Sequence, residues 1–356
     1  MGTVGDVTEQ HTGQRRGQTS EESAHRPSDD WSQVRLHIVS GKGGTGKTTV
    51  AAALALALAS RGKHVLLCEV EGRQGIAQLF DVPPLPYEER RIAQGPDEGG
   101  DVYALAIDAE SAMLEYLNLY YRLGGRTGRM LDRFGVIDFA TTIAPGLRDV
   151  LLTGKVYEAV ERNSRNKNAR RYDAVVLDAP PTGRIAQFLN VNGEFGDLAR
   201  VGTVRGQTER VMKLLKSRRT AVHLVTVLED MPVQETADGI DELRRHDLPV
   251  GGVVVNLTRP QELEGKDLDR ALAGKLPREA IEADLRKVGV DVTPDLLEGL
   301  LEDAQDHAER RALEDVQRAR IRELDATAYE LPRLADGIDL GGLYELAADL
   351  CEQGLA

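Results

Sequence analysis

Short apolar runs of strand length alternate along the chain with longer runs of helical character. The strand-like runs are residues 34–39, 64–70, 101–107, 172–178, 221–228 and 250–256. Residues 47–61 are rich in Ala and Leu and stop at Gly62, which is typical of a helix with a glycine cap, and residues 234–245 form another helical run. Strands that alternate with helices in this way predict an α/β fold.

The remaining segments differ in composition. Residues 1–33 are polar and predict a disordered tail, so we expect the folded domain to cover residues 34–356. Residues 81–100 carry Pro and Gly and predict a connector. Residues 109–165 predict an inserted helical layer beside the sheet, because this length exceeds what a crossover helix needs. Residues 261–327 predict charged, solvated helices, and a short run at 328–332 and a helix at 340–351 close the chain.

A glycine-rich loop lies between the first strand-like run and the first helical run. It fits the pattern G-x-x-x-x-G-K-[ST] of a phosphate-binding P-loop, with Gly41 and Gly46 as its glycines. Glycine suits such a loop because a backbone without Cβ can turn with positive φ and direct N–H groups at phosphate oxygens. The predicted nucleotide-binding residues are Gly41, Lys42, Gly43, Gly44, Thr45, Gly46, Lys47, Thr48 and Thr49. Lys47 is expected to contact the outer phosphates and the Thr48 hydroxyl to bind Mg²⁺.

Other candidate residues follow predicted strands, where a parallel sheet forms its ligand crevice. Asp178 ends an apolar strand and is expected to hold Mg²⁺ through water, as the Walker B aspartate does. Glu71 follows the second strand and is a candidate for orienting the attacking water. Asn256 ends another strand, where its amide is placed to pair with adenine, and Pro332 at the end of the run 328–332 is included among the cofactor-binding residues.

Composition and charge indicate which classes of protein the chain can belong to. Hydrophobic residues make up 41% and charged residues 29% of the chain, as in an ordinary soluble globule, and the net charge of −13 argues against a nucleic-acid-binding surface. The two cysteines, Cys68 and Cys351, lie far apart without metal-site spacing, and Cys68 lies in a predicted buried strand. The sequence has no apolar run of membrane-spanning length, which predicts a cytoplasmic protein.

Lys42 gives the loop the form K-G-G-T-G-K-T, which resembles the deviant Walker A loop of a distinct class of ATPases. The resemblance implies that the early lysine acts across a dimer interface on the nucleotide of the partner subunit. That action corresponds to an arginine finger, which raises phosphoryl-transfer rates by about 10³ to 10⁵.

Taken together, the motifs resemble the arsenite-pump and tail-anchored-protein targeting ATPase family from residue 34 onward. The motifs that carry the resemblance are the loop at 41–49, the run 65–80, Pro145-Gly146-Leu147, the run 178–183, Gln234-Glu235-Thr236 and Val254-Val255-Asn256-Leu257. The family implies a doubly wound, mainly parallel sheet and a dimer with ATP at its interface. It also implies that ATP hydrolysis drives opening and closing of that dimer.

The sequence also departs from the family in ways that leave the cargo open. Glu71 stands where the family has a water-activating aspartate, and the metalloid-binding cysteines and zinc-binding C-x-x-C of its members are missing. The methionine-rich region that forms the targeting groove is short here. We therefore predict ATPase chemistry with ATP and Mg²⁺ as cofactors, without naming a cargo.

Three interpretations remain open at this point. The first is a dimeric, Mg²⁺-dependent ATPase, a homodimer or a heterodimer with a paralogue, whose nucleotide-driven closure binds or releases a protein or membrane-associated client. The second is a non-catalytic, nucleotide-dependent scaffold subunit of such a heterodimer, which the longer Glu71 side chain motivates. The third is a partition or septum-placement ATPase, against which the acidic net charge counts.

Overall fold

The structure is a computed structural model that describes residues 31–96, 99–121, 146–162, 169–198, 203–260, 263, 265–335 and 337–356. Trp31–Ala356 belong to one unit. The predicted tail, apart from its last residues, and the middle of the predicted helical layer at 122–145 lie outside the described residues.

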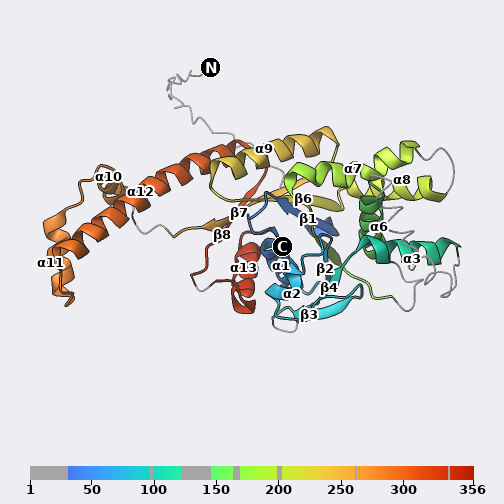
Figure 1. Ribbon diagram of the computed structural model, residues 1–356, viewed down its shortest axis with the longest axis horizontal. Helices are drawn as coiled ribbons and strands as arrows, with labels where there is room; N and C mark the ends of the chain where they lie inside the picture. Colours follow the sequence, from blue (N-terminus) through green and yellow to red (C-terminus); the bar gives the residue numbers. More distant parts are fainter. Residues whose placement is uncertain are drawn as a thin grey trace, which may run out of the picture. The chain divides into compact units, whose positions relative to one another are not determined.

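The described strands form one sheet, whose order is β3-β4-β2-β5-β1-β6-β7-β8 (Figure 1). Its members are β1 (Leu36–Gly41), β2 (Val65–Glu69), β3 (Arg90–Gln94), β4 (Asp101–Ala106), β5 (Ala174–Asp178), β6 (Thr220–Thr226), β7 (Val250–Thr258) and β8 (Ala328–Pro332). All neighbouring pairs are parallel except β3 and β4, which are antiparallel. The strand β1 lies inside the sheet between β5 and β6, so the loop that follows it emerges at the centre of the carboxyl edge.

Helices cover both faces of this sheet. The described helices are α1 (Lys47–Ser60), α2 (Gly75–Leu79), α3 (Ala109–Tyr121), α6 (Leu147–Glu161), α7 (Thr182–Leu198), α8 (Thr203–Leu215), α9 (Asp230–Arg245), α10 (Gly265–Leu272), α11 (Arg278–Lys287), α12 (Pro294–Glu323) and α13 (Leu340–Glu352), of which α10 and α11 pack against α12. A short 3₁₀ turn, Trp31–Gln33, precedes β1. The predicted fold class is therefore confirmed as a doubly wound, mainly parallel α/β sheet. No described helix is both long and apolar enough to cross a bilayer.

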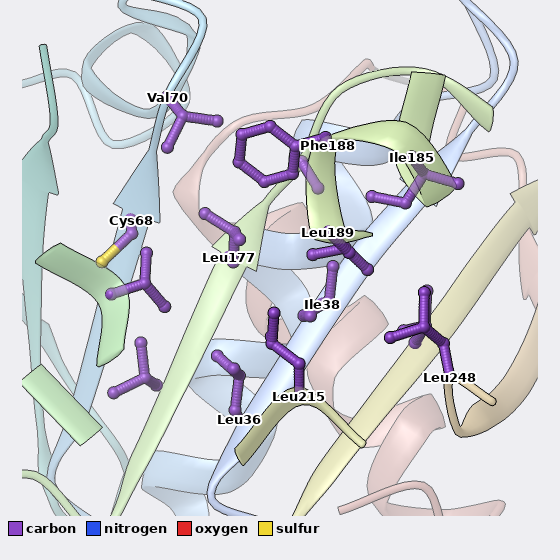
Figure 2. Packing of buried hydrophobic residues seen from close by; sticks show 14 of the residues in the cluster. Leu36, Ile38, Cys68, Val70, Leu177, Ile185, Phe188, Leu189, Leu215 and Leu248 are labelled. Atoms are coloured by element: carbon purple, nitrogen blue, oxygen red, sulfur yellow. The ribbon is translucent and has the colours of Figure 1, made fainter. Parts of the chain in front are cut away.

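Two hydrophobic cores lie on opposite faces of the sheet. On one face, side chains of the central strands pack against α6, α7, α8 and α9, and Figure 2 shows Phe188 and Leu189 of α7 beside Leu177 and Ile38. On the other face the core is formed by α1, α2 and α13. The thiol of Cys68 is buried in the first core, and burial raises its pKa, so it behaves as a small apolar side chain as predicted.

The helix α1 is buried on nearly all sides, because the sheet lies on one side of it and α13 on another. Its Ala and Leu side chains from Ala51 to Ala59 are inaccessible to solvent. Gly62 ends it as predicted, with φ of 82° and its amide donating to the carbonyl of Ala59 at 2.9 Å. The helix that follows the P-loop is therefore held by packing along its length and by a glycine cap at its C-terminal end.

Two element predictions need correction. The expected connector at 81–100 contains β3, a short antiparallel strand at the sheet edge whose arginines Arg90 and Arg91 are exposed. Charged side chains on an edge strand oppose pairing with another chain. Because these side chains are polar, the sequence did not show the apolar pattern by which the other strands were predicted.

The helix expected at 234–245 begins four residues earlier, at Asp230. The charged segment at 261–327 contains α10, α11 and α12, and α11 has no buried residue.

Candidate functional site

The P-loop connects β1 to α1 and depends on glycine at its two motif positions. A Cβ added at Gly41 would collide with the carbonyl oxygen of Val225 on the neighbouring β6, so only glycine allows these strands to approach. Gly46 has φ of 87°, and an added Cβ would collide with the side-chain amide of Asn256. The sequence pattern therefore reflects a steric requirement at each of these two positions.

The start of α1 meets the end of β5. The Thr48 hydroxyl donates a hydrogen bond of 2.7 Å to Oδ2 of Asp178, and Asp178 is only 9% exposed. Burial raises the pKa of Asp178 to about 6, while the Thr48 hydrogen bond and the Lys47 charge act in the opposite direction. Burial lowers the pKa of Lys47, and the carboxylates of Asp178 and Glu71 oppose that effect. The structure thus brings together Lys47, Thr48, Asp178 and Glu71.

The loop after β2 lies beside this group. Glu69, the last residue of β2, is buried and accepts hydrogen bonds from the amides of Gln74 at 2.5 Å and Ile76 at 3.2 Å. A Cβ added at Gly75 would lie 3.2 Å from Cγ2 of Thr48, so the loop packs directly against the start of α1. Glu71 lies 3.6 Å from the guanidinium of Arg73.

Lys42, the other lysine of the P-loop, is engaged within its own chain. Its ammonium forms an ion pair of 2.7 Å with Glu235 of α9. The second oxygen of Glu235 accepts a hydrogen bond of 3.5 Å from the hydroxyl of Thr182, which begins α7 after Asp178-Ala179-Pro180-Pro181. Glu235 therefore connects the P-loop to the segment that follows β5.

The side chain of Asn256 makes a contact that the sequence did not predict. Its buried side-chain amide donates a hydrogen bond of 2.9 Å to the carbonyl of Thr45, so it supports the P-loop backbone. Its expected pairing with adenine stays a prediction. Pro332 ends β8 opposite Thr258, and β6 and β7 separate β8 from β1. The role of Pro332 in nucleotide binding likewise stays a prediction.

The oxygen donors at the junction of α1 and β5 suit a magnesium ion. Mg²⁺ prefers oxygen ligands and is usually held by few protein groups together with water and substrate phosphates. The hydroxyl of Thr48 and the carboxylate of Asp178 are such groups, 2.7 Å apart. No set of three or more His, Cys, Asp or Glu side chains in the described part of the chain is arranged to hold a metal. The donor set fits an ion that phosphates help to bind.

Comparison with known proteins shows which family the chain belongs to. The sequence profile of the anion-transporting ATPase family matches residues 34–217. The chain belongs to this family. ATPase BagA of Mycobacterium tuberculosis is 54% identical over 324 residues, which cover 91% of this chain and 94% of that protein. The arsenical pump-driving ATPase of Escherichia coli is 28% identical over 227 residues, which cover 63% of this chain and 35% of that protein. The resemblance inferred from the motifs is therefore confirmed at the level of the family.

Two residues of the site were not predicted from the sequence. Glu69 is an acid inside an apolar run, which is itself a signal, since a buried carboxylate needs hydrogen-bond donors. Glu235 belongs to a motif that supported the family resemblance, but nothing in its local sequence identified Lys42 as its partner. The pairing depends on α9 packing against β1, β6 and β7 on one face of the sheet.

Proposed function

We propose that the protein is a dimeric Mg-ATP hydrolase whose nucleotide-driven closure binds or releases a protein or membrane-associated client. The observation that carries the enzymatic part is the hydrogen bond of 2.7 Å between Thr48 and Asp178, beside the buried Lys47. It joins the P-loop and the aspartate-ending strand in one oxygen-rich group beside the Lys47 ammonium. Membership of the anion-transporting ATPase family supports the same chemistry.

Each residue of this group has a defined task in hydrolysis. The amides of residues 43–47 and the Lys47 ammonium bind the phosphates, and Glu71 accepts a hydrogen bond from the attacking water. The water oxygen bonds to the γ-phosphorus as the bond to the bridging oxygen breaks, ADP retains that electron pair, and the water proton ends on inorganic phosphate. Thr48 and Asp178 would hold Mg²⁺, which would supply positive charge to the phosphate oxygens when bound.

The dimeric part of the proposal rests on Lys42 and on the motif resemblance. The Lys42 side chain is 29% exposed at the rim of the site, and its ammonium pairs with Glu235 of its own chain in this state. In the closed dimer we expect it to leave Glu235 and contact the nucleotide of the partner subunit. The identity of the client is left open by this proposal.

Nucleotide binding is tested by thermal unfolding with saturating Mg-ATP. The native chain should gain about 2.7 kcal/mol of unfolding free energy at a ligand concentration of a hundred times Kd. Lys47→Ala should lose this gain, while Lys213→Ala, which removes an exposed lysine of α8, should keep it. An unchanged melting temperature of the native chain would contradict the whole proposal.

The action of Lys42 across the dimer is tested by mixing variants. Lys42→Ala should bind ATP with little turnover, and Lys47→Ala should bind no ATP. In a mixed dimer, the Lys42→Ala subunit retains its own Lys47 and receives the partner's Lys42, so partial hydrolysis should return. A verified mixed dimer without recovered phosphate release would show that Lys42 does not act in trans.

A second candidate function is a nucleotide-dependent scaffold without turnover. It is favoured by Glu71, whose side chain is one methylene longer than the aspartate of the family and lies 3.6 Å from the guanidinium of Arg73 in this state. Single-turnover measurements on the native chain and on Glu71→Gln decide between the two functions. Hydrolysis that Glu71→Gln removes supports the enzyme, whereas a native dimer that binds ATP without phosphate release supports the scaffold.

A further inference from the structure

The loop after β2 is held by hydrogen bonds to the side chains of Glu69 and Gln74. Glu69 accepts the amides of Gln74 and Ile76, as described above. The Gln74 side chain in turn bonds to Leu85 twice, donating to its carbonyl at 3.1 Å and accepting from its amide at 2.7 Å. The segment 69–76 is therefore fixed at its start and at its end.

Gln74 adopts a left-handed backbone conformation, with φ of 56°, that costs energy for a residue with a side chain. Gly72 also has positive φ, at 68°. Strained backbone of this kind persists only where surrounding bonds impose it, and here Glu69 and Leu85 supply those bonds. The fold thus maintains an unusual loop directly against Thr48.

The side chain that this loop presents most openly is Arg73. It is 72% exposed, and its distance of 3.6 Å from Glu71 exceeds that of a direct hydrogen bond. An exposed pair of this length contributes little to folding stability. The arginine nevertheless lies close to the P-loop, because it precedes Gly75 by two residues, and an added Cβ at Gly75 would lie 3.2 Å from Cγ2 of Thr48. Its charge also adds to the effect of burial in lowering the pKa of Lys47. A structural role does not explain its position.

We propose that Arg73 is a γ-phosphate-binding residue of its own chain, which leaves Glu71 and pairs with γ-phosphate oxygens when ATP is bound. This inference rests on the proposed function. The guanidinium fork matches two phosphate oxygens at once, a geometry that lysine does not provide. The movement also takes the charge of Arg73 away from the carboxylate of Glu71, so Glu71 then accepts a hydrogen bond from the water without competition from Arg73.

The difference between ATP and ADP tests this assignment, because only ATP offers a γ-phosphate. Affinities for ADP and for a non-hydrolysable ATP analogue are measured by calorimetry with Mg²⁺ on native protein, Arg73→Ala, Arg73→Lys and Arg61→Ala. Arg61 is a matched control, since it follows α1 at the opposite end of the helix from the P-loop and donates to the carbonyl of Cys351.

Arg73→Ala should weaken binding of the analogue about tenfold or more and leave ADP binding unchanged, since a charge-assisted pair is lost. Arg73→Lys should fall between Arg73→Ala and the native chain, and Arg61→Ala should match the native chain. Analogue affinity that stays unchanged in Arg73→Ala, or falls equally with ADP affinity, would overturn the assignment while leaving the ATPase proposal intact. A native chain that binds neither nucleotide would overturn both.

Discussion

The inner and the outer part of the P-loop are held in different ways. The inner part, residues 45–48, is fixed by bonds from across the fold, with Asn256 on the carbonyl of Thr45 and Asp178 on the hydroxyl of Thr48. For the outer part, residues 42–44, the described part of the chain offers no such bond from another strand, and the side chain of Lys42 forms an ion pair with Glu235. Lys47 is 9% exposed, whereas the side chain of Lys42 is 29% exposed.

The difference indicates separate tasks for the two lysines. A buried, preorganised group binds a ligand without a reorganisation cost, which suits the phosphates of a bound nucleotide. A half-exposed lysine with one exchangeable partner suits a contact that forms only in another state of the protein. The comparison predicts that changes to the inner part affect binding and stability, and that changes to the outer part affect the response to the partner subunit.

The largest effect is expected for Gly46→Ala. The substitution forces a Cβ into a left-handed position against the amide of Asn256, so we expect a loss of about 1 to 3 kcal/mol of unfolding free energy and loss of nucleotide binding. Gly43→Ala is the matched change in the outer part, where an added Cβ meets nothing within 4 Å, and should stay within about 0.5 kcal/mol of native. Chemical denaturation and calorimetry measure these effects. Equal losses of unfolding free energy in Gly46→Ala and Gly43→Ala would show that the inner and outer parts are held equally.

The strands β1 and β6 beneath the inner part carry two buried histidines, which are expected to make the stability of the fold depend on pH. His37 of β1 and His223 of β6 are buried, with Nδ1 of His37 lying 3.1 Å from Nε2 of His223. Nδ1 of His223 accepts the amide of Gly252, so its Nε2 carries the proton and donates to His37. Burial lowers the pKa of each imidazole, for His223 from 6.5 to about 4, and for His37 the charges of His223 and Lys63 act in the same direction.

The lowered pKa values make the free energy of unfolding fall as the pH falls. Below pH 6.5 the unfolded chain binds more protons than the folded chain, so the stability present above that pH is lost as pH falls towards about 4. The loss attributable to His223 is on the order of 3 kcal/mol. Urea unfolding at several pH values measures it. His223→Gln should flatten the curve and His246→Gln should not, and a native curve that is flat between pH 6.5 and 4 would contradict the assignment of both rings as neutral.

Much of the inner part was predictable from the sequence because its requirements are local. Gly41, Gly46, Lys47 and Thr48 follow a fixed spacing between a strand and a helix, and backbone sterics dictate their types. Asp178 was predictable because a buried strand that ends in an acid delivers it to the carboxyl edge. The fold class followed from the alternation of strands with helices and from the family resemblance, and the structure confirms it.

The contacts that were missed join residues far apart in the sequence. Lys42 and Glu235 are 193 positions apart, and Thr45 and Asn256 are 211 apart, so no local pattern pairs them. Their meeting depends on the placement of β7 and α9 relative to β1. The strand β3 was missed for a different reason, because an exposed edge strand does not require an apolar face.

A smaller effect is expected for Asn256→Ala. The variant leaves the carbonyl of Thr45 without its donor, so the inner part should lose about 1 to 3 kcal/mol of stability and part of its nucleotide affinity. Asn192→Ala is a matched control, because it removes another buried amide, which donates to Thr153 at 2.7 Å between α6 and α7. Denaturation and calorimetry should show a comparable loss of stability in the control with native nucleotide affinity. Native affinity in Asn256→Ala would show that the inner part does not need this bond.

The smallest effect is expected for Glu235→Gln, which removes the ion pair of Lys42 and keeps a side-chain oxygen that can accept from Thr182. Lys42 and Glu235 are 29% and 36% exposed, so solvent screens their attraction and the pair contributes about 1 kcal/mol or less. If this contact holds Lys42 back from the partner subunit, its removal should lower the protein concentration for half-maximal turnover by about two- to fivefold. ATP affinity at high dilution should not change, because the inner part is intact.

Asp238→Asn is the matched control for this measurement, since Asp238 also lies on α9 and contacts Gln234 of the same helix. Added salt should lower the half-maximal concentration of the native chain towards that of Glu235→Gln, because salt screens the same attraction that the variant removes. A higher half-maximal concentration in Glu235→Gln would have the opposite meaning. Glu235 would then orient Lys42 for the partner subunit, and the outer part would be as preorganised as the inner part.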